Sequence, residues 1–146
     1  MYKLDAHAEA ILQEFRDHQS QFQAVRASIE SKIKERLSAA GILVAAVESR
    51  VKTEHSLAGK LVLKGAKYKS LADITDILGV RVITFYVDDV DKVASAVERL
   101  FEVDWDNSVD KRKLLDLDSF GYLSLHYICR TPELPGYRFE VQMRTI

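Results

Sequence analysis

The last part of the chain alternates between polar and apolar residues, and this alternation constrains the fold more than any other feature. In the stretch RFEVQMRT, Glu140, Gln142 and Arg144 occupy every second position. Successive side chains of a β-strand point to opposite faces, so these residues would share one face and apolar residues the other. The preceding stretch GYLSLHYICR alternates in the same way, and the connector TPELPG favours a hairpin. The sequence therefore predicts two antiparallel strands with one apolar and one polar face.

An amphipathic helix is predicted for the first part of the chain. Apolar residues recur at helical spacing from Asp5 to about Leu37, with charged residues between them. This pattern predicts one long helix or two in tandem, and Gly41 is expected to end it. The stretch ILVAAVESRVK then predicts a strand that becomes polar at its end.

The middle of the chain is predicted to contain two further helices around a central strand. Ser56 is expected to cap a short helix that closes near Gly65. The β-branched run from about Ile77 to Val87 predicts the central strand, and Asp88 or Asp89 is expected to open the second helix. The polar stretch DWDNSVDKRKLLDLDSFG is predicted to be an irregular loop.

Together these elements predict an α+β domain with helices packed on one sheet. The length of 146 residues suits a single core. A formal net charge of -1 at pH 7 gives no electrostatic reason to expect strong nucleic-acid or membrane binding, and the sequence lacks the run of about 18 apolar residues that a membrane span requires. The single cysteine, Cys129, cannot form an internal disulfide, and a cytoplasmic protein is expected.

The polar faces of the two terminal strands would together form a floor of hydrogen-bonding groups. Such a face is most often the solvated side of an antiparallel sheet. A solvated face usually collects Lys, Glu and Thr, whereas this one mixes aromatic, hydroxyl, imidazole, carboxylate, amide and guanidinium groups, which favours a binding surface. Its side chains would be those of Tyr122, Ser124, His126, Glu140, Gln142 and Arg144.

Basic residues upstream can complement this floor. Arg50 and Lys52 lie at the end of one predicted strand, and Lys60 and Lys64 lie one helical turn apart just downstream. Such a cluster suits a polyphosphate, which needs several donors around its charged oxygens. An ordinary charged surface would have the same composition, so the cluster alone does not identify a site.

Asp76 precedes the central strand, and Arg81 lies further along it. A lone Asp before a strand is most often a turn or cap residue. If Asp76 lies beside Glu140, however, the pair suits Mg²⁺, which typically takes one or two carboxylates together with phosphate oxygens and waters.

Four stretches of the chain resemble, in order, the motifs of the RelA/SpoT alarmone synthetase domain. They are RVKTEHSLAGKLVLKG, DITDILGVRVITFYVDDV, GYLSLHY and FEVQMRT. The resemblance implies a nucleotidyltransferase-like fold, with an N-terminal helical segment at 1–40 and a synthetase core at 41–146. It also implies a Mg²⁺-dependent GTP pyrophosphokinase, which transfers pyrophosphate from ATP to the 3′-hydroxyl of GDP or GTP and makes (p)ppGpp.

The same resemblance implies roles for particular residues. Asp76 and Glu140 would hold Mg²⁺, and Glu140 would also be a candidate for deprotonating the attacking hydroxyl. ATP and its phosphates would be bound by Arg50, Lys52, Ser56, Lys60 and Arg81. The acceptor nucleotide would be bound by Tyr122, His126, Gln142 and Arg144.

The chain departs from the family pattern in two respects. The residues before Tyr122 are DLDSFG where many members have a stretch like PKxNG, so Asp118 and Phe120 replace a base and an amide. This leaves the preference for GDP, GTP or another acceptor open. The family also usually continues past the last strand, so we expect a C-terminally truncated fragment with weak or no activity, or one that associates with another copy.

Two other functions fit the same residues. A toxic relative would move pyrophosphate from ATP onto the 3′ end of tRNA, although the near-neutral charge argues mildly against nucleic acid as a partner. A catalytically silent module would bind (p)ppGpp or another nucleotide as a regulator, but it would not need two metal-binding carboxylates. We therefore expect ATP and GDP or GTP as substrates and no membrane partner.

Overall fold

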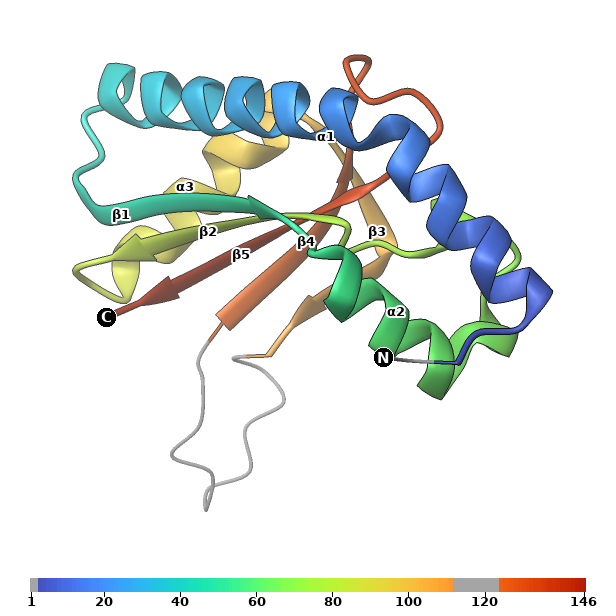
Figure 1. The fold of residues 1–146 in the computed structure, drawn as a ribbon. Coiled ribbons are helices and arrows are strands. Elements are labelled where there is room, and N and C mark those ends of the chain that lie inside the picture. The colour runs from blue at the N-terminus through green and yellow to red at the C-terminus, as the bar shows by residue number, and fades with distance from the viewer. Residues whose placement is uncertain (1–2, 112–123) are drawn as a thin grey trace.

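A computed structural model describes residues 3–111 and 124–146 and contains a five-stranded sheet backed by helices (Figure 1). The strand order is β1-β2-β5-β4-β3. The strands β2 and β5 pair in parallel, and the other neighbouring strands pair antiparallel. The predicted α+β fold and the predicted hairpin of the last two strands are therefore confirmed. The strands are β1 Val44–Val51, β2 Leu78–Thr84, β3 Glu102–Asp110, β4 Ser124–Arg130 and β5 Phe139–Thr145.

Helix α1, Ala6–Ala39, is one continuous helix of 34 residues. Asp5 caps its N-terminus by accepting the backbone N–H of Ala8 at 2.8 Å. Gly41 follows the helix with a φ of +71°, a left-handed conformation that glycine adopts without strain, so the predicted end is confirmed. The apolar stripe of α1 belongs to the hydrophobic core and consists of Ala8, Ile11, Leu12, Phe15, Phe22, Val25, Ile29, Ile33 and Leu37.

Helix α2, Glu54–Lys64, begins two residues before the predicted cap. Thr53 is the capping residue, and its Oγ1 accepts the backbone N–H of Ser56 at 3.1 Å. The prediction that Ser56 caps this helix was therefore wrong, because β1 ends at Val51 and the chain turns at once. The helix gives way at Gly65, as predicted.

Helix α3, Asp88–Leu100, begins at the predicted residue. The preceding strand β2 starts at Leu78 and ends at Thr84, which is three residues before the predicted end. The intervening residues 85–87 are exposed and lie outside the sheet. None of the described helices combines the length and the apolar character needed to span a bilayer.

The edge strand β3 corrects the prediction of an irregular loop from residue 104 onward. It pairs antiparallel with β4, with a register shift between Asp104 and Val109. Its side chains are exposed or half-buried on both faces, which explains why its sequence resembles a loop. The strand is held at the sheet edge by its backbone pairing with β4. Trp105 also packs on Tyr127, with ring centroids 5.2 Å apart. Residues 112–121 of the predicted loop lie outside the described residues.

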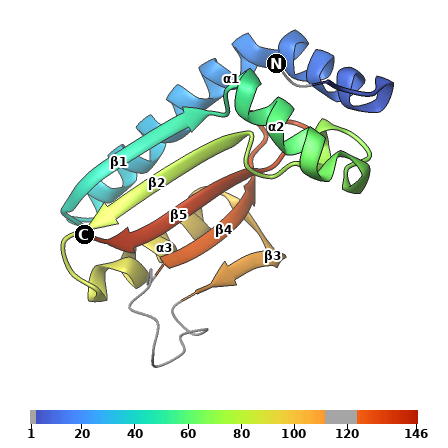
Figure 2. The ribbon, with the colours of Figure 1, turned by 60° about the horizontal axis from the view of Figure 1, so that its bottom comes forward.

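The two faces of the sheet differ as predicted. Helices α1 and α3 lie behind the sheet in Figure 2, and no described helix covers the face turned to the viewer. On the helix side, Phe139, Val141 and Met143 of β5 are fully buried, and each such side chain contributes roughly 1.5–3 kcal/mol by leaving water. The residues between them, Glu140 and Gln142, are half-buried on the open face.

Candidate active site

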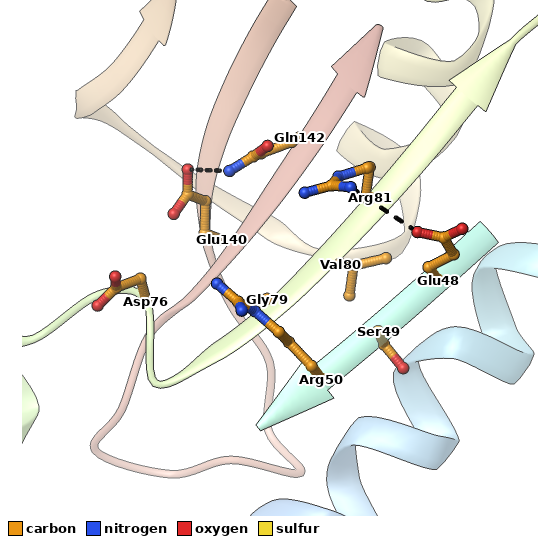
Figure 3. A pocket seen from close by; sticks show the side chains of 9 residues that line it. All are labelled: Glu48, Ser49, Arg50, Asp76, Gly79, Val80, Arg81, Glu140 and Gln142. Atoms are coloured by element: carbon orange, nitrogen blue, oxygen red, sulfur yellow. Dashed lines mark hydrogen bonds and ion pairs between the residues drawn. The ribbon is translucent and has the colours of Figure 1, made fainter. Parts of the chain in front are cut away.

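One row of residues crosses the open face of the sheet near the start of β2. Arg50 of β1 pairs with Gly79 of β2, and Gly79 pairs with Glu140 of β5. Paired residues of neighbouring strands point to the same face, so a guanidinium, a bare backbone position and a carboxylate lie side by side. A cavity of about 310 Å³ opens above this row, and Asp76 and Arg81 also line it (Figure 3).

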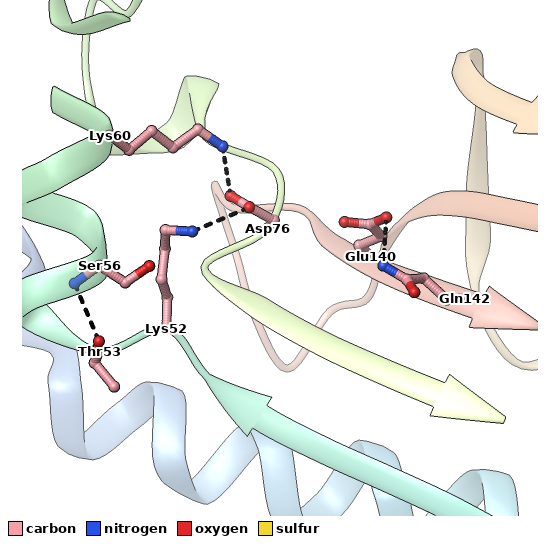
Figure 4. Close-up of polar contacts among 7 residues, drawn as sticks. All are labelled: Lys52, Thr53, Ser56, Lys60, Asp76, Glu140 and Gln142. Atoms are coloured by element: carbon pink, nitrogen blue, oxygen red, sulfur yellow. Dashed lines mark hydrogen bonds and ion pairs between the residues drawn. The ribbon is translucent and has the colours of Figure 1, made fainter. Parts of the chain in front are cut away.

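Asp76 lies in the turn before β2, and two lysines hold its carboxylate (Figure 4). Lys52 Nζ donates to Oδ2 at 3.2 Å, and Lys60 Nζ donates to Oδ1 at 2.9 Å. Burial opposes ionisation of Asp76, but the hydrogen bonds and charges of the two lysines outweigh it and lower its pKa. The carboxylate is therefore ionised at neutral pH and sits between two ammonium groups.

Glu140 is held by its neighbours in the sheet. Gln142 Nε2 donates to Glu140 Oε1 at 3.2 Å, and His126 Nδ1 lies 3.0 Å from the same oxygen. Burial opposes ionisation of Glu140, but His126 and Gln142 outweigh it and lower its pKa, while the charge of Asp76 acts in the raising direction. The second oxygen, Oε2, has no partner among the described residues and lies on the side of Asp76 (Figure 4).

A hydrogen-bonded chain extends from Glu140 away from the cavity. Ser124 Oγ lies 2.8 Å from His126 Nε2, and the other ring nitrogen faces Glu140. A ring that has a proton on Nδ1 can donate a hydrogen bond from that nitrogen to the carboxylate. The imidazole therefore has a defined orientation and fixes that of Glu140.

Asp76 and Glu140 thus line one cavity and point to the same side of the sheet. Two ionised carboxylates, one with an unpartnered oxygen, match the donor set of Mg²⁺, which takes one or two carboxylates and fills its shell with phosphate oxygens and waters. No group of three or more His, Cys, Asp or Glu in residues 3–111 and 124–146 could hold a metal ion. A Mg²⁺ ion bound by these two carboxylates would complete its shell with waters or phosphate oxygens.

The other residues expected to bind ATP surround the same cavity. Arg50 makes no hydrogen bond or ion pair with a described residue, and its side chain points from β1 towards the cavity (Figure 3). Arg81 lies 3.9 Å from Glu48 in an exposed ion pair. Ser56 is exposed in the first turn of α2, and Figure 4 shows its hydroxyl on the side of Lys52.

The residues expected to bind the acceptor are only partly described. Gln142 lines the cavity, whereas His126 and Arg144 lie on the same face of the sheet outside its lining. Arg144, near the end of β5, pairs with Ser124 at the start of β4. Tyr122, expected to stack on the acceptor base, lies outside the described residues, as do the divergent positions 118 and 120 beside it.

Two residues near the site escaped the sequence analysis. Glu48 shares the face of Arg50 and pairs with Arg81, and the period-two alternation of β1 could have identified it. Tyr68 is 8% exposed, and its ring lies 5.7 Å from Lys60 Nζ. The ring therefore gives the Lys60 ammonium group a cation–π contact in addition to its ion pair with Asp76. No sequence signal distinguishes Tyr68, because its contact with Lys60 depends on how the turn after α2 folds back.

Comparisons with known proteins identify the family and the fold of the chain. A family model described as a region found in RelA / SpoT proteins matches residues 49–146. A GTP pyrophosphokinase family protein from Streptococcus pneumoniae is 22% identical, with a TM-score of 0.75 over 91% of this chain and 70% of that one. No curated protein sequence matches the chain.

Two solved structures of a Bacillus subtilis protein also have a similar fold. The small alarmone synthetase 1 bound to its product pppGpp is 20% identical, with a TM-score of 0.75 over 91% of this chain and 74% of that one. The same synthetase bound to AMPCPP is 19% identical, with a TM-score of 0.66 over 92% of this chain and 71% of that one. At such low identity these structures establish the fold, and the match to the family model carries the family assignment.

Proposed function

The chain belongs to the RelA/SpoT family, and from this premise we propose that it is a Mg²⁺-dependent pyrophosphokinase that makes (p)ppGpp. In the proposed reaction, the 3′-hydroxyl oxygen of GDP or GTP attacks the β-phosphorus of ATP. The bond from that phosphorus to the α,β-bridging oxygen breaks, AMP leaves, and the hydroxyl proton passes to a base. The observation that carries the proposal is the presence of Asp76 and Glu140 in one cavity beside two lysines.

The donor side of the proposed site is cationic. Phosphoryl transfer depends mainly on positioning and charge neutralisation, so ammonium and guanidinium groups are the chemistry it needs. Lys52 and Lys60 would bind the triphosphate of ATP, with Ser56 beside them at the start of α2. Arg50 and Arg81 would bind the remainder of the nucleotide over the sheet. The bound AMPCPP of the B. subtilis relative supports an ATP-type donor.

The two carboxylates would act where the phosphoryl group moves. Asp76 and Glu140 would hold Mg²⁺, which when bound neutralises the charge that develops between the phosphates. Glu140 is also placed to accept the hydroxyl proton, because its Oε2 has no partner among the described residues. His126 and Gln142 would keep that carboxylate in one orientation through their contacts with Oε1.

The acceptor would lie on the β4–β5 side of the floor. Gln142 and Arg144 would offer amide and guanidinium groups to its ribose and phosphates. Both ring nitrogens of His126 face Ser124 and Glu140, so His126 would act on the acceptor through Glu140. We propose that Tyr122 stacks on the guanine, an interaction worth roughly 1–3 kcal/mol per base. The pppGpp bound by the B. subtilis relative supports a guanosine acceptor.

The test is product analysis with ATP carrying labelled β- and γ-phosphates. The protein is incubated with Mg²⁺ and either GDP, GTP or tRNA, and the products are separated. We expect AMP and a labelled guanosine product, and the loss of both when a chelator removes the metal. Label on tRNA alone would refute the guanosine acceptor, and the absence of Mg²⁺-dependent AMP release from a full-length version of the protein would refute the enzyme.

A further inference from the structure

Gly79 lies at the centre of the row between Arg50 and Glu140, and the fold gives no reason for a glycine there. Glycine weakens the interior of a strand relative to alanine, so its presence there calls for a cause. Gly41 and Gly136 are explained by positive φ, whereas Gly79 has no positive φ.

Packing does not require a glycine at this position either. A Cβ atom added to Gly79 would meet no atom within 4 Å. The bond to that atom would point to the open face of the sheet, where its paired neighbours Arg50 and Glu140 point, and Gly79 itself lines the cavity. The space that a side chain would occupy is therefore part of the cavity.

The surroundings of this space indicate which part of a ligand would occupy it. The lysines that suit phosphates lie at one end of the site, around Asp76. Arg50 lies beside Gly79 on the neighbouring strand β1, and Arg81 lies two residues further along β2. Both side chains line the cavity (Figure 3). Guanidinium groups stack well on flat rings. An ATP whose triphosphate reaches the lysines would therefore place its uncharged part over Gly79.

We propose that Gly79 is part of the nucleotide-binding surface, because its missing side chain lets the ribose and purine of bound ATP lie against the β2 backbone. This inference rests on the proposed function, because it needs ATP in this cavity. In this inference the nucleotide contacts the backbone of β2 directly. Any residue with a Cβ at position 79 would keep the nucleotide further away.

The inference predicts that a larger side chain at position 79 will keep or raise the stability of the protein and will weaken its binding of ATP. Gly79→Val adds a β-branched side chain, which favours a strand and whose Cβ would meet no atom within 4 Å. We expect its melting temperature to equal or exceed that of the unaltered protein. Affinity for the non-hydrolysable analogue AMPCPP should fall by about tenfold or more, as when a pocket loses room for a few carbon atoms. Gly79→Ala should show a smaller loss of the same sign.

The measurements are calorimetric titration with AMPCPP and Mg²⁺, and thermal unfolding of each variant. Ala46→Val is the matched control, because Ala46 lies on the same face of β1, pairs with Ile83 and does not line the cavity. It should bind AMPCPP as the unaltered protein does. If both variants lose affinity equally, general bulk on this face is responsible and the inference is wrong.

Each remaining outcome also decides the question. Unaltered affinity in Gly79→Val would refute the inference while leaving the proposed function intact. A failure of Gly79→Val and Gly79→Ala to fold would refute it too, because the inference holds that the fold does not need this glycine. If the unaltered protein binds no AMPCPP with Mg²⁺, the proposed function itself fails.

Discussion

Asp76 and Asp104 are both carboxylates held by two cations, yet their surroundings differ. Asp104 Oδ2 accepts from Arg138 at 2.9 Å and from Asn107 at 2.9 Å, and lies 3.6 Å from Arg130. The Asp104 side chain is 10% exposed, whereas that of Asp76 is 31% exposed and faces the cavity. The first cluster ties β3 to its neighbours, and the second lies open to a ligand.

An ion cluster alone therefore does not mark an active site. Arginine presents a rigid planar fork that suits a fixed structural contact, whereas lysine carries a point charge on a flexible stem. Lys52 and Lys60 can therefore turn from Asp76 to phosphate oxygens without moving the backbone. The second distinguishing feature is Glu140, which lines the same cavity as Asp76. Asp76 therefore differs from Asp104 because it shares a cavity with a second acidic residue.

The largest expected effect is on turnover. Glu140→Gln keeps the shape of the side chain but removes its charge, so we expect the rate of AMP release to fall by about 10²–10³, the usual cost of losing one stabilising group at a developing charge. The rate is measured at saturating ATP and guanosine nucleotide. The melting temperature should fall only modestly, because the amide oxygen of the new side chain can still accept from His126 and Gln142, although without the charge of the carboxylate.

Asp104→Asn is the matched control for this substitution, since it also removes one charge from a cluster on the same sheet. We expect it to retain turnover within a factor of a few. A comparable loss of AMP release in both variants would break the distinction between the two clusters.

The second largest expected effect is a loss of folding stability when Asp104 is replaced. Asp104→Ala leaves Arg138, which is 19% exposed, without its carboxylate partner. We expect the free energy of unfolding to fall by about 1–3 kcal/mol, the usual cost of an unsatisfied, largely buried polar group. Urea denaturation measures this change. Arg130→Ala should cost less, because Arg130 is 48% exposed and its ion pair is longer; the reverse order would contradict the assignment.

The smallest effect is on the pH dependence of stability. Burial raises the pKa of Asp104, but Asn107, Arg138 and Arg130 together lower it below the ordinary value of 3.8. A carboxylate with a lowered folded pKa stabilises the protein above its unfolded pKa and loses that contribution as the pH falls through the folded pKa.

Unfolding in urea at neutral pH and below about pH 4 tests this effect. The unaltered protein should lose more unfolding free energy on acidification than Asp104→Asn. Asp76 and Glu140 also have lowered pKa values, so some acid sensitivity should remain in the variant. Identical losses in the two proteins would show that the Asp104 cluster does not contribute.

Sequence periodicity was sufficient for the elements that bury one face. Helix α1 and strand β5 both have an apolar repeat that matches their geometry, and both form as predicted. Strand β3 was missed because it has no buried face, so its stability comes from pairing with β4, which local sequence does not encode. The cap of α2 was misplaced because Thr53 and Ser56 are equally good caps, and only the end of β1 selects between them.

The site was predictable in its residue types and not in its contacts. Alternation placed Glu140 and Gln142 on one face, and the cations upstream suggested phosphate chemistry. The two contacts of Asp76 with Lys52 and Lys60 span 24 and 16 residues, so they depend on the turns that follow β1 and precede β2. The role proposed for Gly79 was not predictable, because it depends on the open space between the cavity and the backbone of this residue.

The parallel pairing of β2 with β5 has a consequence for how the chain can vary in length. Glu140 reaches the cavity only because it aligns with Gly79, and Phe139 and Val141 on either side of it fill the core. Inserting or deleting one residue within β5 before Glu140 would turn the carboxylate inward and an apolar side chain outward. The same mutation would thus damage folding and chemistry together, whereas length changes in the connector after β4 could leave this alignment intact.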